Sequence, residues 1–150
     1  MKKYEIVGKF TNGFARVSKL DKFGLRPLWN FINEQGKLVS KDWFESVNSF
    51  GSGGVKELAR VDVFTKLNFI NQDGKLVSPI WFEDTFVTRS QHFVGVIIYK
   101  KGHSKYNYMD KNGNLLIKEW ADYCSNFTNG VAHFYIGTNK YTITENGEIK

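Results

Sequence analysis

The sequence predicts an all-β protein built as a tandem array of about four antiparallel β-hairpin repeats, and three observations support this fold class. One phrase recurs along the chain: a hydrophobic couplet, a polar turn that ends in Gly, and a second hydrophobic couplet. The glycines of this phrase, Gly36, Gly74, Gly113 and Gly147, are 38, 39 and 34 residues apart, a period typical of repeat architectures. No segment shows a helical period longer than two turns.

Four short hydrophobic segments recur when the repeats are aligned on these glycines, and each has the composition of a β-strand. The first segment covers residues 14–17, 58–61, 96–99 and 131–134. The second covers residues 29–32, 67–70 and 106–109, and the third is the couplet after each Gly. The fourth segment opens seven residues after each Gly, at Trp43, Trp81 and Trp120. We interpret these three tryptophans as equivalent core residues between stacked repeats.

The turn between the second and third segments predicts the hairpin geometry. Asn or Asp opens the turn, two polar residues follow and Gly closes it, as in Asn33–Gly36. This is the pattern of a type I turn followed by a left-handed residue, a conformation that Gly adopts without a Cβ penalty. We therefore expect a bulged hairpin of the same register in every repeat.

The 150 residues suit one repeat domain, with units at roughly residues 10–49, 50–92, 93–126 and 127–150. The last unit lacks a fourth segment, while a strand expected at residues 4–10 nearly has the spacing of one. Residues 1–9 would then either complete the last unit and close a small propeller-like ring, or cap the first unit of an open array. Closure removes exposed sheet edges, and the sequence leaves both alternatives open.

The composition indicates a packed, reduced and basic protein. Hydrophobic residues make up 41% of the chain and aromatic residues 16%, which is enough for a core. The single Cys124 cannot form an internal disulfide, which suits a reducing compartment. The sequence shows no apolar run of membrane-span length and no secretory leader, so we expect a cytoplasmic protein without a membrane partner. The net charge of +6 comes mainly from scattered lysines, which usually serve solubility.

Two recurring motifs resemble the WG-repeat family. The segment Trp29–Lys37 resembles the family signature Trp-Gly-Tyr-Ile-Asp-x-x-Gly-Lys, and Phe10–Val17 resembles Phe-x-x-Gly-Leu-Ala-x-Val. The Gly of the Trp-Gly pair is replaced by Asn30, Asn68 and Asn107, which we expect to keep a left-handed backbone there. The resemblance covers essentially the whole chain, and it implies a non-catalytic β-hairpin array of bacterial or bacteriophage origin.

Catalytic, metal and cofactor sites are not predicted. Cys124 and His133 are nine residues apart, but nothing near Cys124 would lower the pKa of its thiol. The spacings Cys-x-x-Cys and His-x-x-x-His that hold zinc are missing. The stretch Gly51–Gly54 lacks the Lys-Ser/Thr pair of a phosphate-binding loop.

Three carboxylates recur two residues after each tryptophan, at Glu45, Glu83 and Asp122. Catalytic groups are asymmetric, whereas structural contacts repeat from unit to unit, so we interpret these acids as structural. Their expected cross-strand partners are Arg16, Arg60 and His133.

The repeats differ from one another in their loops, and such differences often mark a binding face. Six extra residues lie between Val17 and Trp29, four between Phe50 and Ala59, and five between Trp81 and Phe93. A basic turn at residues 100–105 is either a contact for phosphate or an acidic protein, or only a solvated hairpin tip. The candidate partner-binding residues are Lys19, Lys22, Arg26, Lys100, Lys101, His103 and Lys105.

Two functions follow from these features. The first is a non-enzymatic protein–protein interaction module, such as a subunit of a larger assembly or an inhibitor or immunity-type binder. The alternative is a nucleic-acid-binding protein, suggested by the positive charge and by aromatic residues interleaved with Lys. We expect no cofactor and no small-molecule substrate, because the sequence offers no convergent set of titratable groups.

Overall fold

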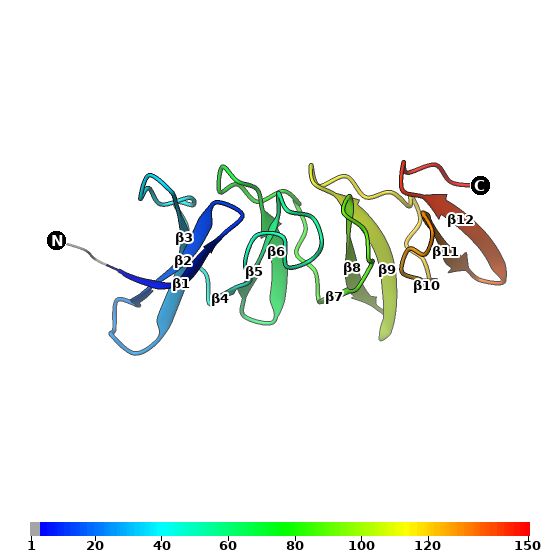
Figure 1. The fold of residues 1–150 in the computed structure, drawn as a ribbon. Coiled ribbons are helices and arrows are strands. Elements are labelled where there is room, and N and C mark those ends of the chain that lie inside the picture. Colours follow the sequence, from blue (N-terminus) through cyan, green and yellow to red (C-terminus); the bar gives the residue numbers. More distant parts are fainter. Residues whose placement is uncertain (1–3) are drawn as a thin grey trace.

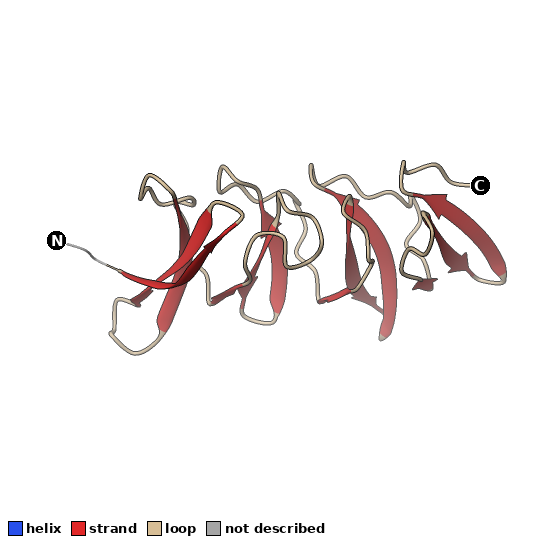
Figure 2. Ribbon diagram, in the orientation of Figure 1, coloured by secondary structure: helices blue, strands red, loops and turns tan. Residues whose placement is uncertain are grey.

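The computed structural model describes residues 4–150, and within this range it contains strands and turns but no helix. Four three-stranded antiparallel sheets follow one another along the chain (Figures 1 and 2). The first two consist of β1 (Glu5–Thr11), β2 (Phe14–Leu20) and β3 (Pro27–Asn33), then β4 (Ser46–Val47), β5 (Ala59–Val63) and β6 (Lys66–Ile70). The last two consist of β7 (Asp84–Phe86), β8 (Phe93–Lys100) and β9 (His103–Asp110), then β10 (Tyr123–Cys124), β11 (Val131–Ile136) and β12 (Asn139–Thr144).

The array is open, so the ring that the sequence left possible is wrong. The two ends of the chain lie at opposite ends of the row of sheets (Figure 1). Strand β1 pairs with β2, with Glu5 opposite Ser18, and does not reach the last sheet. In the first sheet β1 takes the place that β4, β7 and β10 take in the others, so it caps the array. Residues 1–3 lie outside the described residues.

The hydrophobic couplet of the repeat is explained by the stacking of the sheets. Neighbouring residues of a strand point to opposite faces, and both faces of the third strand in a sheet are buried. Phe69 packs with Val94 and Val96 of the third sheet, whereas Ile70 packs with Phe31 of the first sheet. Tyr108 and Met109 divide in the same way between the clusters on either side. Each inner sheet is therefore stabilised mainly by its two neighbours, and each end sheet by one.

The asparagine that replaces the Gly of the Trp-Gly pair is not left-handed, contrary to our expectation. Asn30, Asn68 and Asn107 are fully buried, and none has a positive φ. The Asn30 side chain donates to the carbonyls of Ser40 (2.8 Å) and Asp42 (3.1 Å) and accepts from the amide of Phe31 (2.7 Å). Asn68 and Asn107 hold their own following loops in the same way. The side chain of each asparagine thus joins its strand to the following loop by hydrogen bonds, and we call it an asparagine staple.

The predicted turn is confirmed. Asn33 Oδ1 accepts from the amides of Gln35 and Lys37, and Gly36 follows with φ of 79°. In the second unit the same turn packs against the preceding repeat: a Cβ on Gly74 would lie 2.6 Å from the carbonyl carbon of Val39. Gly36 is therefore needed only for the left-handed backbone conformation. Gly74 is needed for that conformation and also because a Cβ would collide with the preceding repeat.

The register predicted for the third unit is wrong by three residues. Phe93 pairs with Asp110 as Val131 pairs with Thr144, so the first segment begins at Phe93 and not at Val96. The run from Phe93 to Tyr99 is almost continuously apolar, and it carries no alternation to mark the register. The insertion expected before Phe93 shrinks accordingly: the span from Trp81 to Phe93 exceeds the span from Trp120 to Val131 by one residue.

The tryptophans flank the core and do not fill it, which corrects their interpretation as core residues. Trp43, Trp81 and Trp120 are half-buried, whereas the residue after each of them is buried. The Trp120 ring lies 6.3 Å from that of Phe82, centroid to centroid. Each indole therefore packs, half-buried, against the margin of one cluster of buried hydrophobic residues.

Candidate interaction edge

The tips of the four hairpins lie along one edge of the array, which is the lower edge in Figure 1. We call this the hairpin-tip edge. It comprises the turns β2–β3, β5–β6, β8–β9 and β11–β12. The hairpins of the first and third sheets are the longest, with strands of 7 and 8 residues against 5 in the second sheet.

All seven residues predicted as candidates lie on the two long hairpins. They form two groups that are separated by the shorter hairpin of the second sheet. Lys19 lies on β2, with Lys22 and Arg26 in the turn after it. Lys100 ends β8, Lys101 occupies the turn, and His103 and Lys105 open β9.

These candidates differ in how free they are to meet a partner. The Lys19 ammonium lies 4.4 Å from the centroid of the Trp43 ring, in a cation–π contact. Lys105 is paired with Asp122 and is half-buried. The side chains of Lys22, Arg26, Lys100, Lys101 and His103 are exposed. Lys19 and Lys105 therefore already have structural contacts.

The recurring carboxylates brace the hairpin tips, but the partners differ from those expected. Glu83 pairs with Lys66 of the preceding sheet, and Asp122 pairs with Lys105 in the same manner. Glu83 also accepts from the amide of Tyr99 (3.0 Å) at the tip of its own sheet. Each acid thus fixes a tip and joins two sheets.

Two of the acids that brace the tips also accept hydrogen bonds from turn amides. Glu45 accepts from the amide of Phe64, and Asp122 accepts from that of Gly137 (2.7 Å). The expected cations are engaged elsewhere: Arg60 bonds Asp62 (2.9 Å), Arg16 lies over Trp29 and His133 contacts Thr142. The predicted pairing was wrong: lysines on the last strand of the preceding sheet reach Glu83 and Asp122, and Glu45 accepts from a backbone amide.

The environment lowers the pKa of both paired carboxyls. Burial of Glu83 opposes the shift, but the hydrogen bonds from Lys66 and from the Tyr99 amide outweigh it, so its pKa is lowered. The hydrogen bond from Lys105, followed by that from the Gly137 amide, lowers the pKa of Asp122. Both groups therefore stay charged well into the acid range.

Sequence reasoning missed the exposed apolar side chains at the tips. Phe23 and Leu25 are 71% and 78% exposed in the first tip, and Phe64 is 85% exposed in the second. The first tip has a defined loop, because Asp21 Oδ1 accepts from the amides of Phe23 (3.1 Å) and Leu25 (3.0 Å). The sequence feature that could have revealed them is the presence of large apolar residues in turns that are otherwise polar.

Phe64 also has a backbone conformation that is rare for its residue type. Its φ is 57°, in the left-handed region where a bulky side chain is an outlier. Such strain persists only where the surroundings enforce it, and it gathers at functional sites. Here Val63 pairs with Lys66, so Phe64 and Thr65 form a two-residue hairpin turn, a turn type that requires a positive φ at its first residue. The Phe64 amide also donates to Glu45.

Comparison with known families adds to this description. Residues 2–23, which include β1 and β2, match the sequence model of the WG containing repeat. The chain carries a WG repeat. The family resemblance is thereby confirmed over these residues. No curated protein matches the chain. A solved structure of a eukaryotic initiation factor is similar with a TM-score of 0.45 and 18% identity; the match covers 95% of this chain and 43% of that one.

The side chains of Cys124 and His133, which could act as a nucleophile and its base only if they met, lie on opposite faces of the last sheet. Cys124 faces the core opposite Phe134, whereas His133 points away from it toward Thr142. Burial raises the pKa of the Cys124 thiol to about 12. The thiol therefore stays protonated near neutral pH and is a poor nucleophile.

Within residues 4–150, no three His, Cys, Asp or Glu side chains are grouped closely enough to hold a metal ion. The same residues contain no helix that could span a membrane.

Proposed function

We propose that this chain is a non-enzymatic protein-binding module whose hairpin-tip edge docks onto an acidic, partly apolar surface of another protein. The observation that carries the proposal is the exposure of Phe23, Leu25 and Phe64 on turns held in place by carboxylates. Aromatic anchors presented on a rigid support typically dominate binding at protein interfaces.

The charge on the same edge supports an acidic partner. Lys22 and Arg26 flank the apolar residues of the first tip, and Lys100 and Lys101 occupy the third tip. The neighbouring acids Glu83 and Asp122 are paired with lysines of the array. Complementary rim charges mainly speed association and fix orientation. Burying each large apolar side chain contributes about 1.5–3 kcal/mol before the costs of association.

A nucleic acid is the competing partner, since aromatic side chains beside cations also bind single strands. Lys19 and Lys105 already have structural contacts, which weakens that alternative. The inert thiol of Cys124 supports a role without catalysis. We also propose a cytoplasmic location and a bacterial or bacteriophage source, which rest on the single cysteine and on the family resemblance.

The test compares two triple variants in affinity purification from the native host after nuclease treatment. The tip variant carries Phe23→Ser, Leu25→Ser and Phe64→Ser. The control carries Leu38→Ser, Leu76→Ser and Ile80→Ser, which removes exposed apolar residues away from the tips. We expect one protein to be retained by the wild type and the control and to be lost from the tip variant.

The same experiment can overturn the proposal. Retention of that protein by the tip variant would show that the hairpin-tip edge is not the binding surface. The nucleic-acid alternative would be favoured by two results together. The protein is captured only when nuclease is omitted, and the affinity of the chain for single-stranded nucleic acid falls steeply as salt rises.

A further inference from the structure

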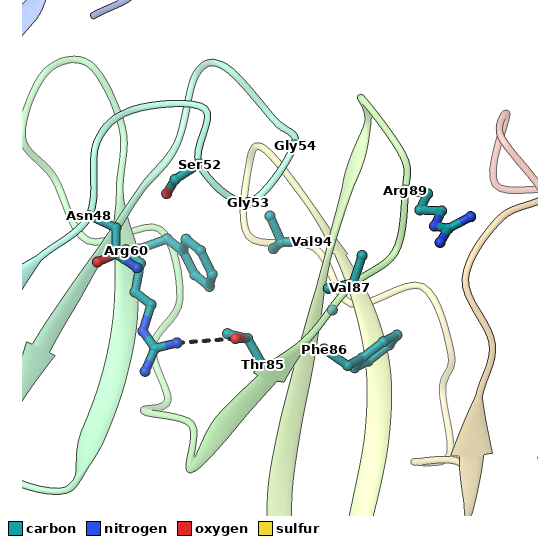
Figure 3. Close-up of a pocket in the computed structure, with 12 residues that line it drawn as sticks. Asn48, Ser52, Gly53, Gly54, Arg60, Thr85, Phe86, Val87, Arg89 and Val94 are labelled. Atoms are coloured by element: carbon teal, nitrogen blue, oxygen red, sulfur yellow. Dashed lines mark hydrogen bonds between the residues drawn. The ribbon is translucent and has the colours of Figure 1, made fainter.

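A cavity of about 370 Å³ lies between the second and third sheets (Figure 3). Its wall on the second sheet consists of Arg60 on β5 and of the β4–β5 loop. Its wall on the third sheet consists of β7 and the residues after it. Phe69 and Val94 supply apolar surface inside, and the volume falls in the range of small-ligand sites.

The cavity forms where this junction departs from the repeat. The β4–β5 loop places Ala59 nine residues after Phe50, whereas the equivalent Ala132 follows Phe127 by five. The lip at Ser52–Gly54 lies in this longer loop (Figure 3). Repeat proteins commonly place binding sites at such per-repeat insertions.

A second departure lies on the other side of the same cavity. Gly95 occupies the position that Arg16, Arg60 and His133 occupy in the other sheets. A Cβ on Gly95 would lie 2.7 Å from the ring of Phe86, so that ring takes the space over this position. Val94 and Val96 face the second sheet, so a side chain at position 95 would point the other way, toward the fourth sheet, where Phe86 packs with Tyr108. Gly95 therefore lines the cavity through its backbone, and the longer β4–β5 loop is the change that opens the space.

The polar group of the cavity is fixed in position. Arg60 donates from Nε to Asp62 (2.9 Å). It also donates from Nη1 to Thr85 Oγ1 (3.1 Å) across the junction, as Figure 3 shows. These two bonds use two of the five N–H donors of a guanidinium. Asn48 and Ser52 add polar groups at the same wall, while the Arg89 guanidinium points away (Figure 3).

We propose that this cavity binds a carboxylic acid that carries an apolar group of leucyl or phenyl size. The apolar group would lie against Phe69 and Val94, and the carboxylate would accept from Arg60, whose planar fork suits that anion. The bonds to Asp62 and Thr85 order the guanidinium before the ligand arrives, which reduces the entropy cost of binding. The C-terminal residue of a polypeptide and a free small acid share this chemistry.

The test is a ¹⁵N-NMR titration with two pairs of probes. One pair is the peptide acetyl-Gly-Leu-Phe as the free acid and as the C-terminal amide. The other is 3-phenylpropionate and 3-phenylpropanamide. We expect the acids to shift the amide signals of Gly53, Gly54 and Gly95 and to bind at least tenfold more tightly than the amides. A tenfold preference for the peptide acid over phenylpropionate assigns the site to a polypeptide terminus, and the reverse assigns it to a small acid.

Three variants decide whether the cavity is the site. Gly53 lacks a positive φ, and a Cβ there makes an ordinary 3.5 Å contact with Val94, so Gly53→Leu fills the cavity without backbone strain. Gly53→Leu should abolish binding, and Arg60→Gln should weaken it at least tenfold. Arg16→Gln, at the equivalent position of the first sheet, should leave it unchanged.

Three outcomes overturn the proposal: no shifts with either acid up to its solubility limit, equal binding of acids and amides, or binding that persists in a folded Gly53→Leu variant. The proposal does not depend on the hairpin-tip edge, and these probes leave that edge untouched.

Discussion

Replacing Gly74 by Ala should destabilise the array much more than the same change at Gly36, although both glycines have φ of 79° and close equivalent turns. The left-handed conformation costs a residue with a Cβ about 1–2 kcal/mol. Ala has fewer conformations than Gly in the unfolded chain, which offsets about 0.5–1 kcal/mol of this cost. At Gly36, where no described atom lies within 4 Å of the new Cβ, the net cost is therefore about 0.5–1 kcal/mol.

At Gly74 a steric cost is added. The new Cβ would lie 2.6 Å from the carbonyl carbon of Val39 and 2.7 Å from the Cα of Ser40, so the second turn must move away from the first repeat. Overpacking of this kind costs about 1–3 kcal/mol. The total for Gly74→Ala is then about 1.5–4 kcal/mol. Gly113 has the same contact with Val77, so its variant should behave like Gly74→Ala.

The assay is urea unfolding of the three Gly→Ala variants under identical conditions, followed by far-UV circular dichroism. The order expected is a small loss for Gly36 and a larger, similar loss for Gly74 and Gly113. Equal losses at all three positions would refute the claim that the turns pack against the preceding repeat. They would leave only the conformational requirement that the turn sequence itself predicts.

Three further predictions concern the staple, the carboxylates and the first strand. Asn68→Ala should cost about 2–4 kcal/mol in urea unfolding, because buried carbonyls and an amide lose their partners; an unchanged midpoint would contradict this. Glu83 and Asp122 have lowered pKa values in the fold, so their stabilisation is present above about pH 4.5 and is lost as pH falls through the folded values. A Glu83→Gln, Asp122→Asn variant should show a shallower loss of thermal stability from pH 5 to pH 3 than the wild type. Deleting residues 1–9 should remove hydrogen-exchange protection from β2 but not from β12, and loss at β12 would contradict the open array.

The repeated phrase predicted the fold class and the turns because both depend on local chemistry. Four polar turns closed by Gly, each between hydrophobic couplets, dictate hairpins whatever lies beside them. The couplet itself also reports the stacking, since Phe69 and Ile70 can both be buried only if sheets cover both faces of β6. The ring was not decided by such patterns, because closure depends on how far each sheet rotates relative to the next.

The role of the asparagines was predicted wrongly, again because it depends on how distant segments are arranged in space. Their backbone tolerance of positive φ is a property of the residue alone, whereas their actual contacts depend on where the loop after the turn returns. Only the folded structure places the carbonyl of Ser40 beside Asn30. The partners of Glu83 and Asp122 were missed although Lys66 and Lys105 each precede their acid by 17 residues. A recurrent spacing does not show which of two cations on the same sheet, Arg60 or Lys66, reaches the acid.

The seven candidate residues were predicted from the insertion between Val17 and Trp29 and from the basic turn at residues 100–105, and the sequence shows both features. The apolar residues at the tips and the cavity were missed, and each depends on exposure. The side chain of a Phe in a short turn can face solvent or pack against the sheet. The sequence around Phe64 does not distinguish the two orientations. The cavity needs the extra residues of the β4–β5 loop and the Arg60 side chain to meet β7 and β8 at one junction.

The open array separates the groups that stabilise the fold from those available for binding. Buried couplets, asparagine staples and turn glycines act between neighbouring sheets, where a change in one repeat is felt by the next. The hairpin tips project beyond this stack, and their apolar side chains contribute little to it. Tip residues can therefore vary from repeat to repeat without loss of the fold, as the contrast between the tips of the first and second sheets shows. A repeat array with this division can acquire a binding surface by changing turns alone.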